Sequence, residues 1–319
     1  MNLQSILRGG LALAALLLAP TFCLAGAPQL KTQAPGYYRM TLGDFEVTAL
    51  NDGTFMMPTD KLLTNTTPAK TEKALAAAFL KNPVESSVDG YLINTGSKLV
   101  LVDTGAGPYF GPTLGNLLAS LKASGYSPEQ VDEVYITHMH ADHIGGLASG
   151  GKLNFPNAIV RADQHDVDYW VSQEHMDAAP ADSKEFFKAA IESIKPYMDA
   201  GRFKPFDGNT ELVPGVRAVA ARGHTPGHTT YVVESNGQKL ALWGDLLHVA
   251  AVQFPNPAVT IAFDTDSKSA AAQRKLAFAD AAKNGYWVAA AHLPFPGFGH
   301  LRASGSGYAW VPANYSTLH

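Results

Sequence analysis

The sequence predicts an α/β fold in which two mixed sheets are each covered by helices on the outer face, a four-layer αβ/βα sandwich. Short runs of β-branched and aromatic residues occur in both halves of the chain, and helical patterns follow them in each half. Segments rich in His and Asp follow several predicted strands. Because strand ends on one rim of a sheet lie close together in space, this order also predicts a polar site at that rim.

The charge balance argues against a nucleic-acid partner. Lys and Arg total 24 against 28 for Asp and Glu, which gives a formal net charge of -4. Proteins that bind DNA or RNA usually carry a strongly basic surface. We therefore expect a small-molecule partner and no nucleic acid.

The N-terminus has the pattern of an export signal. Arg8 provides a positive start, and residues 9–18 form an apolar run that is too short to span a bilayer. Ala25 and Ala27 offer the small residues that a signal peptidase requires. This pattern predicts a periplasmic or secreted protein.

We expect residues 1–27 to be a signal peptide and residues 28–319 to form a single domain. Cys23 is the one cysteine of the chain and would leave with the signal peptide. The mature chain would then contain no disulfide and no thiolate metal ligand. No later apolar run reaches membrane length, so we expect no membrane contact after signal removal.

The first half of the chain alternates between predicted strands and helices. Residues 45–50 form a strand that a turn at 51–53 closes. Helical spacing of leucines predicts a helix over 113–123. The other predicted elements are strands at 91–94, 98–102, 134–136 and 158–160, a helix beginning within 163–170, and a helix over 182–198 that Pro196 weakens near its end.

The second half repeats this organisation. Asp266 or Ser267 can cap a helix that runs to about Lys283, and Gly285 is typical of a residue just past a helix end. The predicted strands of this half are 216–220, 230–234, 239–243 and 286–290.

The loop that follows strand 134–136 contains three imidazoles and one carboxylate in six consecutive residues, 138–143. Side chains alternate in extended backbone, so His138 and His140 point to the same side and can share a metal ion. Asp142 and His143 lie further around the turn, where they would crowd the same ion. A second ion about 3.5 to 4 Å away relieves this crowding and matches the spacing of two-metal hydrolytic sites.

Three more ligand candidates stand at the ends of other predicted strands. His224 lies in a Gly- and Pro-containing turn over residues 223–228, which leaves its imidazole exposed. Asp245 and His292 follow strands 239–243 and 286–290. These distant loops can meet the first cluster at one rim without special bending.

This set of residues resembles the signature of the metallo-β-lactamase superfamily, HxHxDH followed by a distant His, Asp and His. The resemblance covers nearly the whole mature chain. It implies two divalent metal ions, with Zn as the first expectation and Mn, Co or Fe as alternatives. The implied ligands are His138, His140 and His224 for one ion, Asp142, His143 and His292 for the other, and Asp245 as the bridge between them.

The same resemblance gives supporting roles to two further residues. Asp103, within Val102-Asp103-Thr104-Gly105, matches a family motif and would orient the site; the alternative is a turn-forming Asp. His228 lies beside the His224 turn and is expected to pack behind the ligands.

Parts of the chain are also very similar to the methyl parathion hydrolase group, which includes dihydrocoumarin hydrolases and other lactone-cleaving relatives. The similar segments are 36–40, 99–105, 136–140 and 223–234. The resemblance implies that Phe110, Trp170 and Phe186 line an aromatic pocket; otherwise each is an ordinary core aromatic. Such walls suit a flat leaving group or a fused-ring lactone.

Four positions depart from the organophosphate-cleaving pattern of that group. Leu62 stands where that pattern has Arg, His248 and Phe263 where it has Leu, and Ile261 where it has Thr. These residues would make the wall of the substrate pocket bulkier and differently charged. The departures favour a lactone or aryl ester over an organophosphate as substrate.

The predicted activity is hydrolysis of lactones or aryl esters by a hydroxide that bridges the two metals, because bound divalent metals lower the pKa of water toward 7. The residues at the reacting centre would be Asp245, His292, whose metal takes the developing oxyanion, and Asp142, which assists proton movement. Relatives of this group often form dimers, so a homodimer is a further expectation.

Other functions are compatible with the same ligand set. An aryl organophosphate triester hydrolase is the main alternative. A true β-lactamase, a glyoxalase II and an RNA-processing nuclease share the superfamily signature, but the acidic balance argues against RNA. A metal-storage protein would close its coordination shell with protein ligands, whereas seven ligands for two ions leave open positions.

Overall fold

The computed structural model describes residues 26–181 and 183–317. A compact unit begins at Pro35. Residues 26–34 contain no helix or strand. The predicted signal peptide, 1–27, falls mostly on residues 1–25, which lie outside the described residues.

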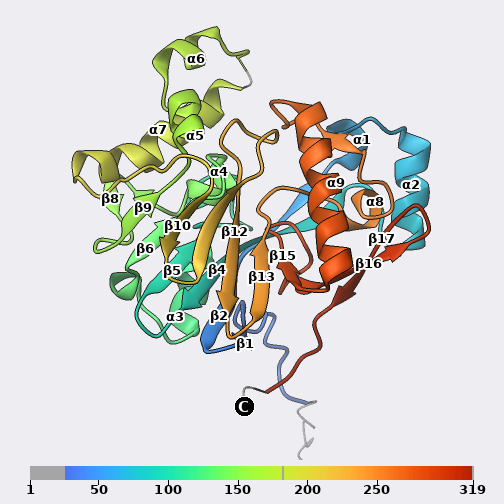
Figure 1. Cartoon of the computed structure of the whole chain (residues 1–319), viewed down its shortest axis with the longest axis horizontal. Coiled ribbons are helices and arrows are strands. Elements are labelled where there is room, and N and C mark those ends of the chain that lie inside the picture. Colours follow the sequence, from blue (N-terminus) through green and yellow to red (C-terminus); the bar gives the residue numbers. More distant parts are fainter. Residues whose placement is uncertain (1–25, 182, 318–319) are drawn as a thin grey trace, which may run out of the picture. The chain divides into compact units, whose positions relative to one another are not determined.

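Two mixed sheets run through the unit that begins at Pro35, as the sequence predicts (Figure 1). In the first sheet the strand order is β1-β2-β4-β5-β6-β9, and the last three strands are parallel. Its strands are β1 (Tyr37–Leu42), β2 (Phe45–Met57), β4 (Val84–Asn94), β5 (Leu99–Val102), β6 (Glu133–Tyr135) and β9 (Ile159–Arg161).

The second sheet contains the strands of the C-terminal half. Its order is β10-β11-β12-β13-β15-β16-β17, and only the β13 and β15 pair is parallel. Its strands are β10 (Thr210–Val213), β11 (Val216–Ala220), β12 (Thr229–Ser235), β13 (Gln238–Leu242), β15 (Trp287–Ala289), β16 (Phe298–Ser304) and β17 (Gly307–Pro312).

Helices and short strands complete the unit. Two small sheets pair β3 (Leu63–Thr64) with β14 (Thr260–Ile261) and β7 (Ala148–Ser149) with β8 (Lys152–Leu153). The helices are α1 (Thr59–Leu62), α2 (Pro68–Ala77), α3 (Leu117–Ala123), the 3-10 helix η1 (Pro128–Gln130), α4 (Ala141–Ile144), α5 (Gln164–Trp170), α6 (Gln173–Ala178), α7 (Lys184–Asp199), α8 (Ala250–Gln253) and α9 (Ser267–Asn284).

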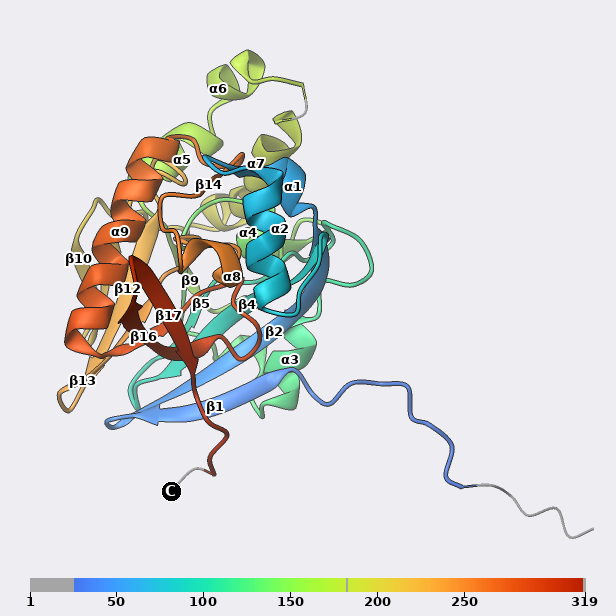
Figure 2. The same ribbon diagram turned by 90° about the vertical axis from the view of Figure 1, so that its right-hand side faces the viewer.

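Alternating side chains on the strands build the layers. On β5, Val100 faces the second sheet, where it joins Val216 and Leu240 in a core between the sheets. Its neighbour Leu101 faces the opposite way and packs in a cluster with residues of α3, α5 and α7. On the second sheet, Val288 packs against α9, which lies along the outer face of that sheet (Figures 1 and 2). The four-layer prediction is confirmed.

One predicted turn is wrong. Residues 51–53 do not end the strand; β2 continues to Met57 with a bulge between Asn51 and Gly53. The physical reason is Asp52, which is buried and accepts hydrogen bonds from the backbone N–H groups of Ala106, Gly115 and Leu117. The turn-forming residue thus anchors the neighbouring loop instead of reversing the chain.

Helix bounds also differ from the predictions where local signals are weak. The helix predicted over 113–123 begins at Leu117, because Asp52 takes the N–H groups of the preceding turn. The start predicted at Asp182 falls on a residue outside the described ranges; α7 begins at Lys184 and continues through Pro196 to Asp199. Within residues 26–181 and 183–317, no helix has the length and apolar character that crossing a membrane requires.

The predicted helix near the C-terminus is confirmed, with both of its end signals. Asp266 caps α9 by accepting a hydrogen bond from the Ser269 N–H, and Gly285 adopts φ 66° directly after the last turn. The adjacent strand prediction also agrees, since β15 spans Trp287–Ala289. The loops after β13 and β15 therefore leave the second sheet at one rim.

Candidate metal centre

The HxHxDH segment follows β6, the central parallel strand of the first sheet. Asp103, at the end of β5, accepts hydrogen bonds from the N–H and hydroxyl of Thr137 and lies 2.9 Å from His143 Nδ1. It adopts a left-handed backbone with φ 59°, which turns its carboxylate toward this loop. These contacts connect the HxHxDH loop to the end of β5, and the role of Asp103 in orienting a metal site stays a prediction.

A second buried carboxylate, Asp166 on α5, connects two ligand loops, and the sequence did not indicate it. It accepts hydrogen bonds from Met139 N–H and Thr225 Oγ1, each at 2.9 Å, and from Gly227 N–H. Burial raises the pKa of this carboxyl to about 6. Asp166 fixes the loop around His138 relative to the turn that carries His224.

One group of ligand atoms consists of His138, His140, His224 and Asp245, all buried. His224 Nε2 lies 3.1 Å from His140 Nδ1 and 3.3 Å from Asp245 Oδ2. His138 Nε2 lies 3.6 Å from the same Asp245 oxygen. Three distant loops thus place four ligand atoms around one point.

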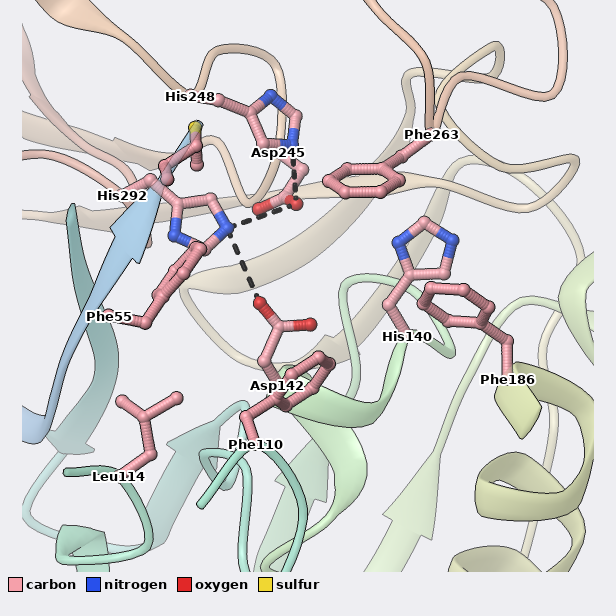
Figure 3. Close-up of a pocket in the computed structure, with 11 residues that line it drawn as sticks. Phe55, Phe110, Leu114, His140, Asp142, Phe186, Asp245, His248, Phe263 and His292 are labelled. Atoms are coloured by element: carbon pink, nitrogen blue, oxygen red, sulfur yellow. Dashed lines mark ion pairs between the residues drawn. The ribbon is translucent and has the colours of Figure 1, made fainter. Parts of the chain in front are cut away.

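A second group consists of Asp142, His143 and His292. Asp142 Oδ2 lies 3.6 Å from His143 Nε2 and 3.5 Å from His292 Nε2. Asp245 reaches this group as well, since its Oδ1 is 3.3 Å from His143 Nε2 and its Oδ2 is 3.3 Å from His292 Nε2. Figure 3 shows Asp142, Asp245 and His292 facing one another. The Asp245 carboxylate therefore lies between the two groups, the position of a bridge.

The residues present fit two metal ions. His138 Nε2, His143 Nε2 and Asp245 Oδ1 are buried and have no hydrogen-bond partner. Buried polar atoms without partners are costly, so their convergence on one place requires a compensating ligand. Four ligands at about 2.0 to 2.1 Å from a tetrahedral ion are about 3.3 Å apart, close to the separations in the first group.

Two of the histidines, His138 and His140, and the Asp245 carboxylate have the protonation state that cation binding needs. Burial and the neighbouring imidazoles lower the pKa of both His138 and His140 well below the usual value, which keeps these rings neutral. Burial alone would raise the pKa of Asp245, but His292 and His143 hold it well below its usual value. The Asp245 carboxylate raises the pKa of the other three ligand histidines, His143, His224 and His292, so a metal ion would bind to them in competition with protons.

The outward nitrogen of the ligand histidines is held by a second contact. His224 Nδ1 lies 2.8 Å from Asp264 Oδ1, and His292 Nδ1 lies 2.8 Å from the Ser87 carbonyl oxygen. Such contacts orient the ring and raise its basicity as a ligand. Asp264 and Ser87 had no motif in the sequence that could have identified them.

Two histidines that are not in the signature also contact Asp245. His228 Nε2 accepts a hydrogen bond from the Asp245 N–H at 3.0 Å, and burial lowers the pKa of His228 to about 3. His248 Nε2 lies 3.0 Å from Asp245 Oδ2, and its ring stacks on His292 with centroids 5.1 Å apart. His228 thus packs behind the site, and His248 lies at its open side.

A cavity opens over these residues (Figure 3). Of the seven predicted pocket residues, four line it: Phe110, Phe186, His248 and Phe263. The sequence did not indicate the other wall residues of this cavity, Phe55, Met57 and Leu114.

The other three predicted pocket residues lie elsewhere. Leu62 and Ile261 pack in the core cluster around Met57, behind the pocket wall, because they belong to the β3 and β14 region. Trp170 lines an adjoining cavity that shares Phe186 and Phe263, and its ring lies edge-on to His140 at 5.2 Å. The structure therefore brings the metal ligands together fully and the predicted pocket only in part.

The model of the metallo-β-lactamase superfamily matches residues 84–292, a span that contains all seven predicted ligands. The chain belongs to this superfamily. Its fold and its HxHxDH site are therefore those of a metallo-β-lactamase protein.

Two solved structures of this superfamily are similar over most of the chain. Hydrolase AbOPH is 35% identical, with 90% of this chain and 100% of that chain covered and a TM-score of 0.86. AidC, a dizinc quorum-quenching lactonase solved with its product N-hexanoyl-L-homoserine, is 28% identical, with 88% and 99% covered and a TM-score of 0.83.

Curated relatives match over shorter segments. An N-acyl homoserine lactonase from Bacillus cereus is 31% identical over 126 residues, which is 40% of this chain and 42% of the lactonase. A Bacillus sp. lactonase is 33% identical over 115 residues, which is 38% of its length. The chain thus matches less than half the length of these two lactonases.

Proposed function

We propose that the protein is a two-metal hydrolase that cleaves lactones and aryl esters, within the methyl parathion hydrolase and dihydrocoumarin hydrolase group. The observation that carries this proposal is the Asp245 carboxylate, which lies between two groups of His and Asp ligands at the base of an aromatic cavity. The similarity to AidC, a dizinc lactonase, supports the same reaction class.

The ligand set accounts for the chemistry. Two divalent metals bound there would lower the pKa of a bound water toward 7 and polarise an ester carbonyl. Asp142 lines the cavity and is the most exposed of the ligands that form ion pairs, with 15% of its side chain accessible. Its carboxylate is placed to take up the proton that water loses during attack.

The cavity wall indicates the substrate class. Phe55, Phe110, Phe186 and Phe263 surround the metal ligands, and no Lys or Arg is among the residues that line the cavity. Aromatic rings bind a flat apolar group well but offer nothing to a phosphate or carboxylate charge. A neutral lactone or aryl ester with an apolar substituent therefore fits better than an anionic polymer.

A neutral aryl phosphotriester is the second candidate. Its aromatic leaving group could use the same Phe110 and Phe186 wall, and it carries no charge that the cavity would have to neutralise. His248 and Phe263 line the cavity, and we propose that their bulk disfavours a tetrahedral phosphorus centre, so that this activity is a minor one.

The two candidates are separated by a substrate panel at equal enzyme concentration. The panel contains dihydrocoumarin, an N-acyl homoserine lactone, an aryl acetate and an aryl dimethyl phosphotriester. We expect the largest kcat/KM for a lactone or the aryl acetate, and at least ~10-fold less for the phosphotriester. A preference for the phosphotriester, or no turnover of any lactone or ester above the metal-free control, would contradict the proposal.

We also propose that the protein is exported and acts in the periplasm or outside the cell. The support is the charge and apolar pattern of residues 1–27. Mass measurement of protein recovered from the periplasm should show cleavage near Ala25 or Ala27, whereas an intact N-terminus in the cytoplasm would rule out this location.

A further inference from the structure

Arg274, on α9, is an arginine that the proposed chemistry does not use. Its side chain is fully buried, and none of the ion pairs among the described residues includes it. It donates instead to three backbone carbonyl oxygens, those of Leu246, Val259 and Pro257. Burial lowers the pKa of this guanidinium only to about 10, so it remains charged at neutral pH. A buried cation without a carboxylate is costly, and the carbonyls are its compensation.

Gln253, on α8, shares one of these carbonyls. It is also fully buried, and its Nε2 donates to the Val259 oxygen at 3.1 Å. Its Oε1 accepts hydrogen bonds from the N–H groups of His248 at 2.7 Å and Val249 at 2.9 Å. We call Arg274 and Gln253 together the carbonyl brace, because they meet at the Val259 carbonyl.

The carbonyl brace forms hydrogen bonds with both ends of the segment 246–249. Arg274 holds the Leu246 carbonyl directly after the bridging Asp245, and Gln253 holds the N–H of His248. These residues lie between β13 and α8 and have no regular secondary structure of their own. Backbone hydrogen bonds of the segment involve only its end residues, Leu246 and Val249, so side-chain partners contribute to the position of its backbone. This position sets the contact of His248 Nε2 with Asp245 at 3.0 Å.

We propose that Arg274 and Gln253 are positioning residues that hold residues 246–249 so that His248 stays against Asp245, and that they thereby set which substrates the cavity accepts. The link to substrate preference rests on the proposed function. Neither side chain lines the cavity, so an effect on substrates would act through the backbone that they hold, and His248 is the cavity residue to which Gln253 bonds directly.

The test compares R274M and Q253M, which remove the brace, with H248L, which removes the residue that the brace positions. Phe278→Leu is the control on the same helix, because Phe278 is fully buried and packs on Trp243, Phe254 and Tyr308 but makes no hydrogen bond to residues 246–249. We expect R274M and Q253M to lower the ratio of lactone to phosphotriester kcat/KM at least ~5-fold, in the direction of H248L, while F278L leaves it within about 2-fold. R274K, which keeps the charge, should fall between R274M and the wild type.

A double variant shows whether the effect passes through His248. In the H248L background, R274M should change the substrate ratio by less than about 2-fold, because two changes that act through one residue are not additive. An unchanged ratio in both R274K and Q253M, an equal shift in F278L, or a full additional shift in R274M/H248L would each overturn the proposal. R274K and Q253M decide the matter if R274M does not fold.

An activity-independent measurement separates this inference from the proposed function. The amide hydrogens of His248 and Val249 are bonded to Gln253, so their exchange in the full metal-loaded protein should be at least ~10-fold faster in R274K and Q253M than in F278L. A wild type that fails to hydrolyse lactones would remove the proposed function, yet this exchange difference would still decide on the brace. Equal exchange in all variants would overturn it.

Discussion

The metal centre and the wall of the cavity above it are built in different ways. In the metal centre, four of the seven predicted ligands come from six consecutive residues, and most of the histidine rings are held by a second polar contact. The wall instead combines apolar side chains from β2, from the loop before α3, from α7 and from the loop that carries Phe263. Directional bonds fix the first region, whereas shape and packing fix most of the second, with the hydrogen-bonded His248 as the exception.

This difference separates chemistry from specificity. Loss of a directional bond to a buried charged group costs more than a change of apolar shape, because the partner left behind stays desolvated. We therefore expect variants of the metal centre to remove activity and variants of the wall to redistribute it among substrates.

The largest loss of activity is expected at Asp245, whose carboxylate lies close to both ligand groups. Replacing Asp245 with Ala removes the atoms that lie between them, so hydrolysis should fall on the order of 10³-fold and the second metal should be lost. Metal analysis and kcat measure both effects. Asp207→Asn, an exposed carboxylate in a different His and Asp group, serves as the control. A variant that retains full activity and two metals would refute the bridge.

A variant of Asp103 tests whether the hydrogen bonds behind the ligands contribute to metal affinity. Asp103→Asn keeps the shape but weakens the contacts with Thr137 and His143. We expect metal affinity to fall about 10- to 100-fold, as measured by competition with a chelator. Unchanged affinity would mean that the His143 ring is held by packing alone.

The wall is tested at His248 and Phe263. Changing both to Leu reduces bulk on one side of the cavity and removes the His248 contact with Asp245. The ratio of phosphotriester to lactone kcat/KM should rise about 10-fold, while the metal content stays at two per chain. Loss of metal in this variant would show that the wall and the centre are not separable.

The smallest expected effect concerns pH and Asp166, which joins two ligand loops. Burial raises the pKa of Asp166 from 3.8 to about 6, so the folded protein binds more protons than the unfolded chain between these values. This group therefore favours the folded state less as pH rises from about 4 to 6. Relative to Asp166→Asn, the wild type should lose roughly 1 kcal/mol of stability between pH 5 and pH 7. Denaturant titration of both metal-free proteins measures this difference, and parallel curves would contradict the pKa.

The parts of the fold that could be predicted are those with local signals. The α9 helix has its cap at Asp266 and its stop at Gly285, and the HxHxDH segment is contiguous after a strand. The bulge at Asp52 could not be predicted, because its three N–H partners lie more than fifty residues away. The edge strands β1, β10 and β17, and β16 beside β17, were also not predicted.

In the site as well, residues with a local sequence signal could be predicted and residues that act through distant contacts could not. His224, Asp245 and His292 could be predicted because the ligand types stand at strand ends in a known order. Asp166 and Arg274 could not, since a buried charge that joins distant loops leaves no spacing pattern in the sequence. The departures at Leu62 and Ile261 marked positions that lie behind the cavity wall, because similarity to a family does not by itself say which side chains reach the cavity.

The most direct test of the account is a metal titration of the full chain with lactone hydrolysis as the readout. After chelation and removal of metals, activity should be absent, and it should return as Zn or Mn is added, reaching a plateau at two ions per chain. Turnover by the metal-free protein, or a plateau reached at one ion, would contradict the claim that seven converging His and Asp side chains form a two-metal hydrolytic centre.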